Sequence, residues 1–516
     1  MAFPLLPRYL ICSGRKLDHL IAFICGCVFL VFGYNQGVMS GILTMPSFLE
    51  TFPLIDPDAA GDSHYERSVR STNQGLAVAS YNLGCFLGAV ITIFIGNLLG
   101  RKRVLFLGTL IMLVGAALQA SATALPHFIV GRVITGVGNG LNTSTVPTWQ
   151  SELTRPHKRG KMVLLDGALI TGGIMISYWV DFGFSFVSGC VSWRLPLALQ
   201  CVFCIPVLYL LPWMPESPRW LILKTRNDAA EEVLAALYHD DEDSRARVEV
   251  EFHTIQDTVA EMSKGKFSDL FTMDKNRNLH RTLLGYWIQV FQQLSGINLI
   301  TFYAAVIYSN LGMSGFMSRL LAAVNGTEYF LASIPAMFLV ERVGRRKLLL
   351  FGTIGQAATM AVLAGVNSRT DKGFQIAGII FLFVFNTFFA LGWLGTSWLY
   401  PAEIVPLRIR APANALSTSA NWIFNFIVVM ITPIAFNSIG YQTYVIFAAI
   451  NAFIVPCVYF LYPETAGRTL EEMDSIFHKV DGWKGAFTVV EKARTEPLWS
   501  QRSREALVGQ DGAVNP

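Results

Sequence analysis

The chain has 516 residues, of which 53% are hydrophobic and only 15% are charged. Soluble domains carry about 25% charged residues, so this composition argues against a soluble protein and favours a helical membrane protein. The net charge of +4 is too small to indicate nucleic-acid binding. The eight cysteines show no metal-type spacing, so we expect buried thiols and no metal site.

Apolar segments of bilayer-crossing length follow one another along the chain, and we count twelve. The first is longer than a signal-peptide core, which predicts a retained helix. The longest polar interruption, 215–281, separates the sixth segment from the seventh and contains two predicted amphipathic helices. The predicted spans are 20–43, 75–99, 103–122, 126–148, 163–182, 193–214, 283–309, 317–340, 347–366, 374–400, 411–435 and 441–462.

Basic residues predict the orientation of these spans. They gather in the loops after spans two, four, eight and ten, as in Arg101-Lys102-Arg103 and Arg345-Arg346-Lys347, whereas the loop after span one is acidic. Because cytosolic loops carry an excess of lysine and arginine, the even-numbered loops, the central polar segment and both termini are predicted to be cytosolic.

Four landmarks of the first half recur in the same order in the second half, about 250 residues later. They pair Gly100-Arg101 with Gly344-Arg345, Glu152 with Glu403, Arg159 with Arg410, and Pro215-Glu216 with Pro463-Glu464. Two parallel six-helix repeats are the plan of a transporter whose site lies between the repeats. The predicted organisation is a cytosolic segment (1–19), an N-terminal bundle (20–214), a cytosolic linker (215–281), a C-terminal bundle (282–462) and a cytosolic tail (463–516).

This ordered set of motifs resembles the sugar-porter family of the major facilitator superfamily, and most closely its fungal hexose and glycerol transporters. The resemblance covers about residues 20–478 and implies an all-α membrane protein with twelve transmembrane helices in two six-helix pseudo-repeats. The motifs that carry it are Gly100-Arg101-Lys102-Arg103, Gly131-Arg132, Pro215-Glu216-Ser217-Pro218-Arg219, Gln292-Gln293-Leu294-Ser295-Gly296-Ile297-Asn298, Gly344-Arg345-Arg346, Tyr400-Pro401-Ala402-Glu403-Ile404 and Pro463-Glu464-Thr465.

Charged residues at the predicted cytosolic surface are candidates for a gate. A charge pair there can hold two helices together and break when the two halves rock. The alternative is that these residues are topology signals in weak surface pairs, each worth about 0–1 kcal/mol. The family often has an acidic residue before each basic turn. This sequence has Asn97 at that position in the first half and an acid, Glu341, in the second half. The resemblance assigns the gate to Arg101, Glu152, Arg159, Glu216, Arg345, Glu403, Arg410 and Glu464.

Side-chain amides and aromatic residues in spans seven, ten and eleven are candidates for a sugar site. Amides both donate to and accept from hydroxyl groups, and an aromatic ring can cover the C–H face of a sugar. Interhelical hydrogen bonding is the alternative reading. The candidates are Gln292, Gln293, Asn298, Tyr303, Trp393, Trp398, Asn421 and Asn425. The resemblance assigns sugar hydroxyls to Gln292, Gln293, Asn298 and Asn425, and stacking to Trp398.

The sequence departs from the family at three positions near this site. Span ten reads Trp393-Leu394-Gly395-Thr396-Ser397-Trp398 and lacks the usual helix-bending Gly-Pro. Tyr329 stands where the family usually has asparagine, and Gly167 where it has glutamine. These departures argue against ordinary glucose as the ligand.

Three residues bear on what drives transport. Proton-coupled family members carry an aspartate where this chain has Asn35, and that aspartate is thought to exchange its proton against an arginine that matches Arg132. An amide cannot ionise near neutral pH, so Asn35 favours uncoupled uniport. Asp166, an acid within span five, supports the alternative of proton symport, since intramembrane acids are functional candidates.

The sequence therefore predicts a monomeric plasma-membrane carrier that takes up a hexose, pentose or polyol by alternating access. Its expected partners are the sugar or polyol, the lipid bilayer and, in the symport alternative, protons; we expect no cofactor and no nucleic acid. No nucleophile–base or metal constellation indicates an enzyme. A non-transporting nutrient sensor is the alternative, and the stretch after about residue 478, some 38 residues, is short for the long cytosolic tail that such sensors usually carry.

Overall fold

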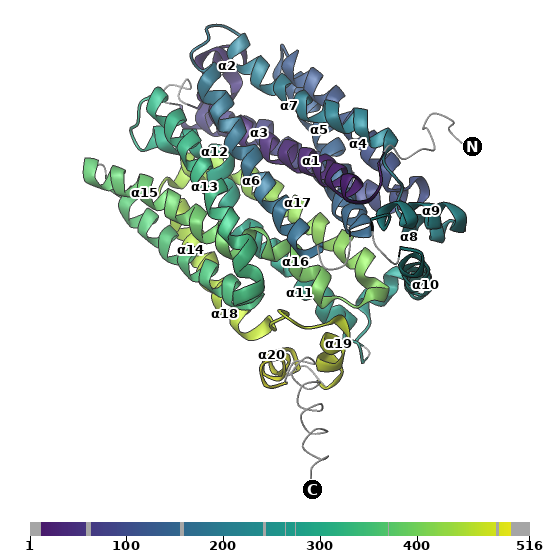
Figure 1. The fold of residues 1–516 in the computed structure, drawn as a ribbon. Coiled ribbons are helices and arrows are strands. Elements are labelled where there is room, and N and C mark those ends of the chain that lie inside the picture. The colour runs from purple at the N-terminus through teal and green to yellow at the C-terminus, as the bar shows by residue number, and fades with distance from the viewer. Residues whose placement is uncertain are drawn as a thin grey trace.

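The computed structural model describes residues 12–57, 63–154, 159–240, 244–263, 265–273, 275–369, 371–480 and 485–496. Every regular element in these ranges is a helix (Figure 1). Eleven helices are long and apolar enough to cross a membrane. The predicted span at 126–148 is also a helix, α5 (Leu125–Leu153), but its buried polar residues, among them Arg132 and Asn142, lower its hydropathy.

The twelve predicted spans are all helical, which confirms the fold class. The first half comprises α1 (Gly14–Ile42), α3 (His64–Leu99), α4 (Arg101–Ala120), α5, α6 (Arg159–Phe184) and α7 (Val191–Leu210). The second half comprises α11 (Asn278–Leu294) with α12 (Ile297–Asn310), α13 (Gly315–Val343), α14 (Arg345–Asn367), α15 (Lys372–Phe389) with η6 (Ala390–Leu394) and α16 (Thr396–Ile404), α17 (Arg410–Ile439) and α18 (Gln442–Leu461).

Matching glycine turns show the repeat in three dimensions. Gly100, between α3 and α4, has φ 91°, and Gly344, between α13 and α14, has φ 97°. This backbone conformation favours glycine, because a side chain would be strained there. A Cβ at Gly100 would also lie 2.6 Å from a carboxylate oxygen of Glu216, and one at Gly344 2.5 Å from Glu464. Each turn is therefore closed by the glutamate of its own half.

The two spans that carry the most polar candidates are interrupted helices. Span seven is broken by Gly296, whose φ of 97° separates α11 from α12. Span ten passes through η6, a π-helical turn, between α15 and α16. Span ten is thus irregular at Gly392 although it lacks the Gly-Pro pair, and π-turns of this kind are frequent at functional sites.

The most extensive contacts between the halves are made by three helix pairs: α3 with α17, α6 with α13, and α1 with α12. The contact of α3 with α17 is close at Gly75, where a Cβ would lie 2.5 Å from the Met430 carbonyl oxygen. Small residues allow helix backbones to approach in this way within membranes. Side chains of these six helices therefore determine what lies between the halves.

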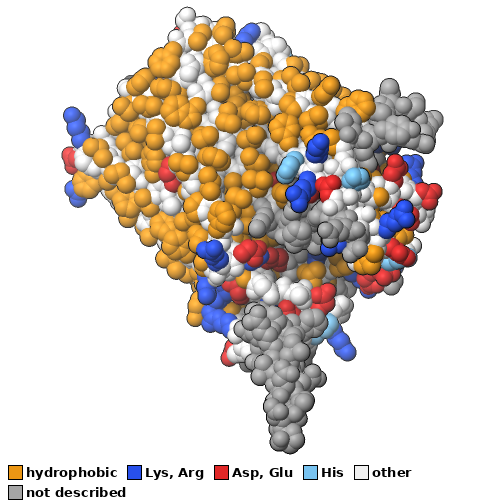
Figure 2. Space-filling view, in the orientation of Figure 1, with side chains coloured by type: hydrophobic (Ala, Val, Ile, Leu, Met, Phe, Trp, Pro, Cys, Tyr) orange, Lys and Arg blue, Asp and Glu red, His pale blue; other side chains and the backbone are white. Residues whose placement is uncertain are grey.

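Helices that are not part of the twelve spans gather at one end of the bundle, which we call the basic end because it carries the Gly100-Arg101 and Gly344-Arg345 turns. They are α8 (Pro218–Leu223), α9 (Asn227–Leu237), α10 (Ser244–Ser263), η5 (Phe267–Phe271), η7 (Leu407–Ile409), α19 (Leu470–His478) and α20 (Gly485–Thr495). Figure 2 shows charged side chains concentrated there, whereas apolar side chains cover the face of the bundle. The opposite end carries α2 (Pro46–Thr51) and η1 (Pro53–Ile55).

Candidate functional site

Three amides join α11 to α17 and to the irregular part of span ten. Asn421 donates to Gln289 Oε1 at 2.7 Å and to Gln292 Oε1 at 2.9 Å. Gln289 Nε2 in turn donates to the Ser397 carbonyl at 3.0 Å, and Gln292 Nε2 lies 3.5 Å from the Trp393 carbonyl. The π-helical turn and the residues after it therefore present backbone acceptors to two amides of α11, which in turn accept from Asn421 of α17.

The amide chain continues across the break in span seven. Gln293 Nε2 donates to Gln292 Oε1 at 3.3 Å, and Asn298 donates to Gln293 Oε1 from the far side of Gly296. The positive φ of Gly296 turns the chain here, so Asn298 at the start of α12 faces the end of α11. The structure thus brings together four predicted amides, Gln292, Gln293, Asn298 and Asn421, into one hydrogen-bonded chain.

The remaining predicted amide links the two halves. Asn425, one helical turn after Asn421 on α17, accepts a hydrogen bond of 2.9 Å from Asn82 on α3. Asn82 and Gln289 were not among the candidates from the sequence. Both are amides within apolar spans, the same signal that indicated the others, and Asn82 is the one that contributes from the first half.

The predicted aromatic residues are placed differently from one another. Tyr303, at a non-helical point within α12, donates to the Val429 carbonyl of α17 at 3.0 Å. The indole of Trp393 donates to Thr353 on α14 at 3.0 Å, so its ring packs toward α14 while its carbonyl faces Gln292. Trp398 is half-buried, on the turn of α16 that follows Ser397.

The amides of the cluster are buried, with exposed fractions between 0% for Asn82 and 5% for Gln293. Buried amides are costly unless they are hydrogen-bonded, and here each of them bonds at least one other amide. A hydroxyl-bearing ligand between the halves would exchange these bonds for bonds of the same kind. The cluster is therefore chemically suited to polyhydroxylated molecules.

The three coupling candidates have separate partners. Asn35 donates to the Val31 carbonyl of its own helix at 2.9 Å. Arg132 donates to the Val78 carbonyl at 3.0 Å and lies over the Tyr81 ring, 4.9 Å from its centre. Asp166 faces Gln150 Nε2 at 3.4 Å.

At the basic end, the first half contains a charged network around Arg101. Its guanidinium donates to Glu152 at 3.1 Å and to Asn97 at 3.2 Å, so the asparagine at the family's acidic position still accepts a hydrogen bond. Glu216 accepts from the backbone amides of Arg101 and Lys102. Burial raises the pKa of the Glu216 carboxyl above its ordinary value, although hydrogen bonds from backbone amides oppose that rise.

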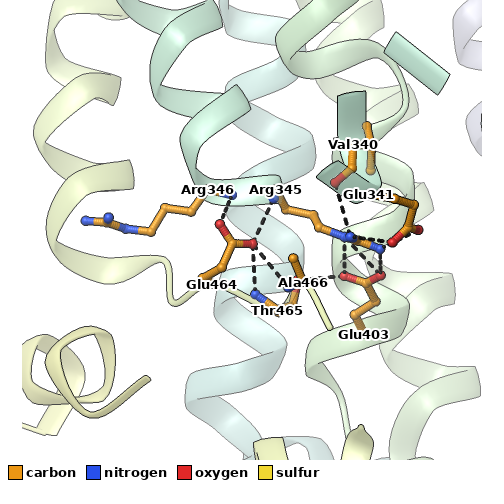
Figure 3. A network of polar contacts seen from close by, with 8 residues as sticks. All are labelled: Val340, Glu341, Arg345, Arg346, Glu403, Glu464, Thr465 and Ala466. Carbon is orange, nitrogen blue, oxygen red and sulfur yellow. Dashed lines mark hydrogen bonds and ion pairs between the residues drawn. The ribbon is translucent and has the colours of Figure 1, made fainter. Parts of the chain in front are cut away.

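The second half contains the matching network, shown in Figure 3. Arg345 donates to Glu403 at 2.7 Å and to Glu341 at 2.9 Å. Glu464 accepts from the backbone amides of Arg345 at 2.8 Å and Arg346 at 3.2 Å. Each of these ion pairs joins elements of one half, because Arg101 and Glu152 belong to the first half and Arg345, Glu341 and Glu403 to the second.

The remaining two gate candidates, Arg410 and Arg159, lie at the starts of α17 and α6. Arg410 donates to the Val405 carbonyl at 3.4 Å, at the start of α17. Arg159 begins α6, but its side chain lies outside the described residues.

The structure adds a polar cluster at the opposite end that sequence reasoning missed. Arg319, early in α13, donates to the Thr44 carbonyl at 3.1 Å and to its hydroxyl at 3.2 Å. Asp181, late in α6, accepts from the Gly41 amide at 3.2 Å and interacts electrostatically with Arg319. Asp181 is an acid within an apolar span, so the signal that indicated Asp166 could have found it.

The sequence of this chain is similar to those of known proteins over most of its length. The family described as "Sugar (and other) transporter" matches residues 19–477. The chain is 39% identical over 475 residues to "Sugar transporter STL1" of Saccharomyces cerevisiae, covering 90% of this chain and 82% of that protein. It is 40% identical over 482 residues to "Major facilitator superfamily transporter mfsA" of Aspergillus fumigatus, covering 90% and 87%.

The fold also matches a solved structure, that of the proton:xylose symporter XylE bound to 6-bromo-6-deoxy-D-glucose. The TM-score is 0.75 at 23% identity, covering 90% of this chain and all of that chain (100%). Two six-helix halves with buried amides between them define a carrier of the major facilitator superfamily. The chain belongs to the sugar transporter family of that superfamily, in which its fungal relatives are named as transporters.

Proposed function

We propose that this protein takes up a monosaccharide or a polyol by alternating access. The observation that carries the proposal is the amide chain Gln289–Asn421–Gln292–Gln293–Asn298, with the Asn82–Asn425 bond joining the halves beside it. Hydroxyl groups can replace each of these bonds as donor or acceptor. The ligand would therefore bind between the halves, in contact with α11, α12 and α17 and with α3.

The distribution of polar links supports a rocking motion. At the opposite end, links cross between the halves: Arg319 to Thr44, and the Ala305 amide to Ser40 at 3.0 Å. At the basic end, the ion pairs of Arg101 and Arg345 stay within their halves. Separation of the halves at the basic end can therefore leave both charged networks intact, whereas separation at the opposite end must break the crossing bonds.

We propose uniport as the transport mode. Asn35 cannot titrate, and its amide is bonded within α1. Asp166 faces an amide, Gln150, and its electrostatic partners include no arginine among the described residues. Proton symport through Asp166 is the alternative mechanism, since an acid within a span can carry a proton.

We also propose that the protein acts as a monomer in the plasma membrane. The basic loops support cytosolic termini, a cytosolic linker and a cytosolic basic end. The proposed domains are the two bundles, 20–214 and 282–462, joined by the linker 215–281, with short segments before and after them.

Uptake by cells that lack their own hexose carriers tests the proposal. Labelled glucose, xylose, galactose, glycerol and lactose are supplied separately, with and without a protonophore. We expect one monosaccharide or polyol to equilibrate across the membrane, without accumulation and without sensitivity to the protonophore. Accumulation that collapses with the protonophore would overturn uniport. Failure of every compound, with the protein at the cell surface, would favour a non-transporting sensor.

A further inference from the structure

Arg132 is a fully buried cation within the first half, at 0% exposure. One terminal nitrogen donates to the Val78 carbonyl, but Nε and the other terminal nitrogen, Nη1, have no hydrogen-bond partner in the described structure. A charge removed from water in this way is strongly unfavourable unless it is paired. A group that supplies acceptors and a negative charge would therefore stabilise this arrangement.

Among the residues that the structure describes, the buried acids of the spans, Asp166 and Asp181, do not supply that charge. The groups that interact electrostatically with Arg132 are Tyr81, Cys85 and Tyr303, which are neutral at physiological pH. Asp166 faces Gln150, and Asp181 is held by Gly41 and Arg319 at the opposite end. Residue 35 on α1 is an amide and cannot be a counter-ion.

The unpaired guanidinium lies beside the contact between the halves. Its aromatic neighbour, Tyr81 on α3, packs edge-on against Trp422 of α17, with ring centres 6.4 Å apart. The residue after Tyr81 on α3 is Asn82, and Asn82 bonds Asn425, which lies three residues after Trp422 on α17. The Tyr81–Trp422 contact therefore lies next to the amide pair of the proposed site. Trp422 is also fully buried, and its Nε1–H has no hydrogen-bond partner in the described part of the chain.

Buried donors without acceptors are thus concentrated at this point. Arg132 contributes two N–H groups and Trp422 one, and both side chains pack against the Tyr81 ring. A carboxylate is acceptor-only and can bond a guanidinium through both of its oxygens. A neutral hydroxyl would leave the charge of Arg132 uncompensated.

We infer that Arg132 forms, with Trp422, a subsite for the carboxylate of an anionic substrate, so that the carrier binds sugar acids (hydroxylated carboxylates) in preference to their neutral counterparts. This inference rests on the proposed function and narrows its substrate class. The hydroxyl groups of the ligand bind the amide cluster, and its carboxylate replaces the missing counter-charge of Arg132.

Matched ligands test the inference on the purified full-length protein. Each pair differs in a carboxylate: gluconate with glucitol, glucuronate with glucose, and glycerate with glycerol. Binding is measured by calorimetry and by tryptophan fluorescence, to which Trp422 contributes. We expect the acid of at least one pair to bind about tenfold more tightly than its neutral partner, the size of a charge-assisted hydrogen bond.

Variants locate the effect. Arg132→Gln should abolish the difference in binding affinity between each acid and its neutral partner. Arg132→Lys should retain part of that difference. Arg194→Gln is the control, because Arg194 also lies over an aromatic ring, Trp193, and bonds a carbonyl, that of Ala122, but on α7. The control should leave the difference unchanged. If Arg132→Gln does not fold, the wild-type ratio and Arg132→Lys still decide.

Each other outcome contradicts the inference. Equal binding of acid and neutral partner overturns the anion subsite and leaves the proposed function intact. A difference that survives in Arg132→Gln overturns the assignment to Arg132. Binding of chloride at matched ionic strength, with no preference for the acids, indicates an inorganic anion instead. Failure of all six ligands to bind contradicts the proposed function itself.

Discussion

At the scale of single residues, the amides of the candidate site act as both donor and acceptor. Gln292 accepts from Asn421 and from Gln293, and its nitrogen faces the Trp393 carbonyl. It is the point where bonds from α11, α17 and span ten meet. Truncation at this position therefore removes more ligand-competent bonds than truncation elsewhere in the cluster.

Gln292→Ala should raise the half-saturating concentration for uptake about tenfold, because loss of an uncharged hydrogen bond costs about 0.5–1.5 kcal/mol and neighbouring amides lose their alignment. The measurement is labelled uptake normalised to surface expression. Gln119→Ala is the control, since Gln119 is a buried amide bonded to Thr135 within the first half. Unchanged uptake by Gln292→Ala would remove the central residue of the site.

Asp166→Asn should change uptake by less than about twofold if transport is uncoupled, because the neutral side chain still offers an acceptor to Gln150. The measurement is uptake over a pH series with and without a protonophore. Loss of accumulation in this variant, together with a pH-dependent wild type, would assign the proton to Asp166 and contradict uniport.

At the scale of elements, two interrupted spans shape the site. Gly296 separates α11 from α12 and places Asn298 against Gln293, and η6 exposes the Trp393 carbonyl to Gln292. Continuous helices would satisfy their carbonyls internally and would direct these side chains elsewhere. The interruptions therefore create the backbone acceptors and the turn on which the amide chain depends.

Gly296→Ala should destabilise the protein by about 1–3 kcal/mol, because its φ of 97° is strained for alanine. The new Cβ would also lie 3.0 Å from Met360 Cε and from a ring carbon of Phe447. Thermal unfolding of the purified protein measures the effect. Gly365→Ala on α14 is the control, since a Cβ there meets nothing within 4 Å. Equal melting temperatures of the two variants would show that the interruption at Gly296 tolerates a side chain.

At the scale of the whole molecule, the two ends differ in how the halves are joined. The opposite end has bonds between α13 and the end of α1, and between α12 and α1. The basic end has two charged networks, one in each half. The crossing bonds at the opposite end therefore contribute to the balance between states open to either side.

Arg319→Gln should shift this balance toward opening at the opposite end, by about 1 kcal/mol or about fivefold. The measurement is labelling of Ser40→Cys by an impermeant maleimide in a Cys190→Ser background, because Ser40 is buried at the crossing. Arg70→Gln is the control, since Arg70 also donates to carbonyls at this end but within the first half. Equal labelling in both variants would contradict the role of Arg319.

Particular residues show how far the sequence predicts this protein. The charged turns at Gly100-Arg101 and Gly344-Arg345 could be identified from sequence because each motif specifies its own local conformation. Gln289 and Asn82 could not be ranked, because an amide in an apolar span has the same signal whether it faces the site or a neighbouring helix. The orientation of Trp393 toward Thr353 depends likewise on packing against α14.

The sequence by itself determined the twelve helices, their division into two repeats and the family. These properties follow from apolar length, charge placement and local motifs, which act within one segment. The tertiary structure alone decided that Asn425 meets Asn82, that Arg319 meets Thr44 and that no acid among the described residues interacts with Arg132. Such pairings depend on the rotation of each helix about its axis and on which helix it packs against, and these are set by the whole interface between the halves.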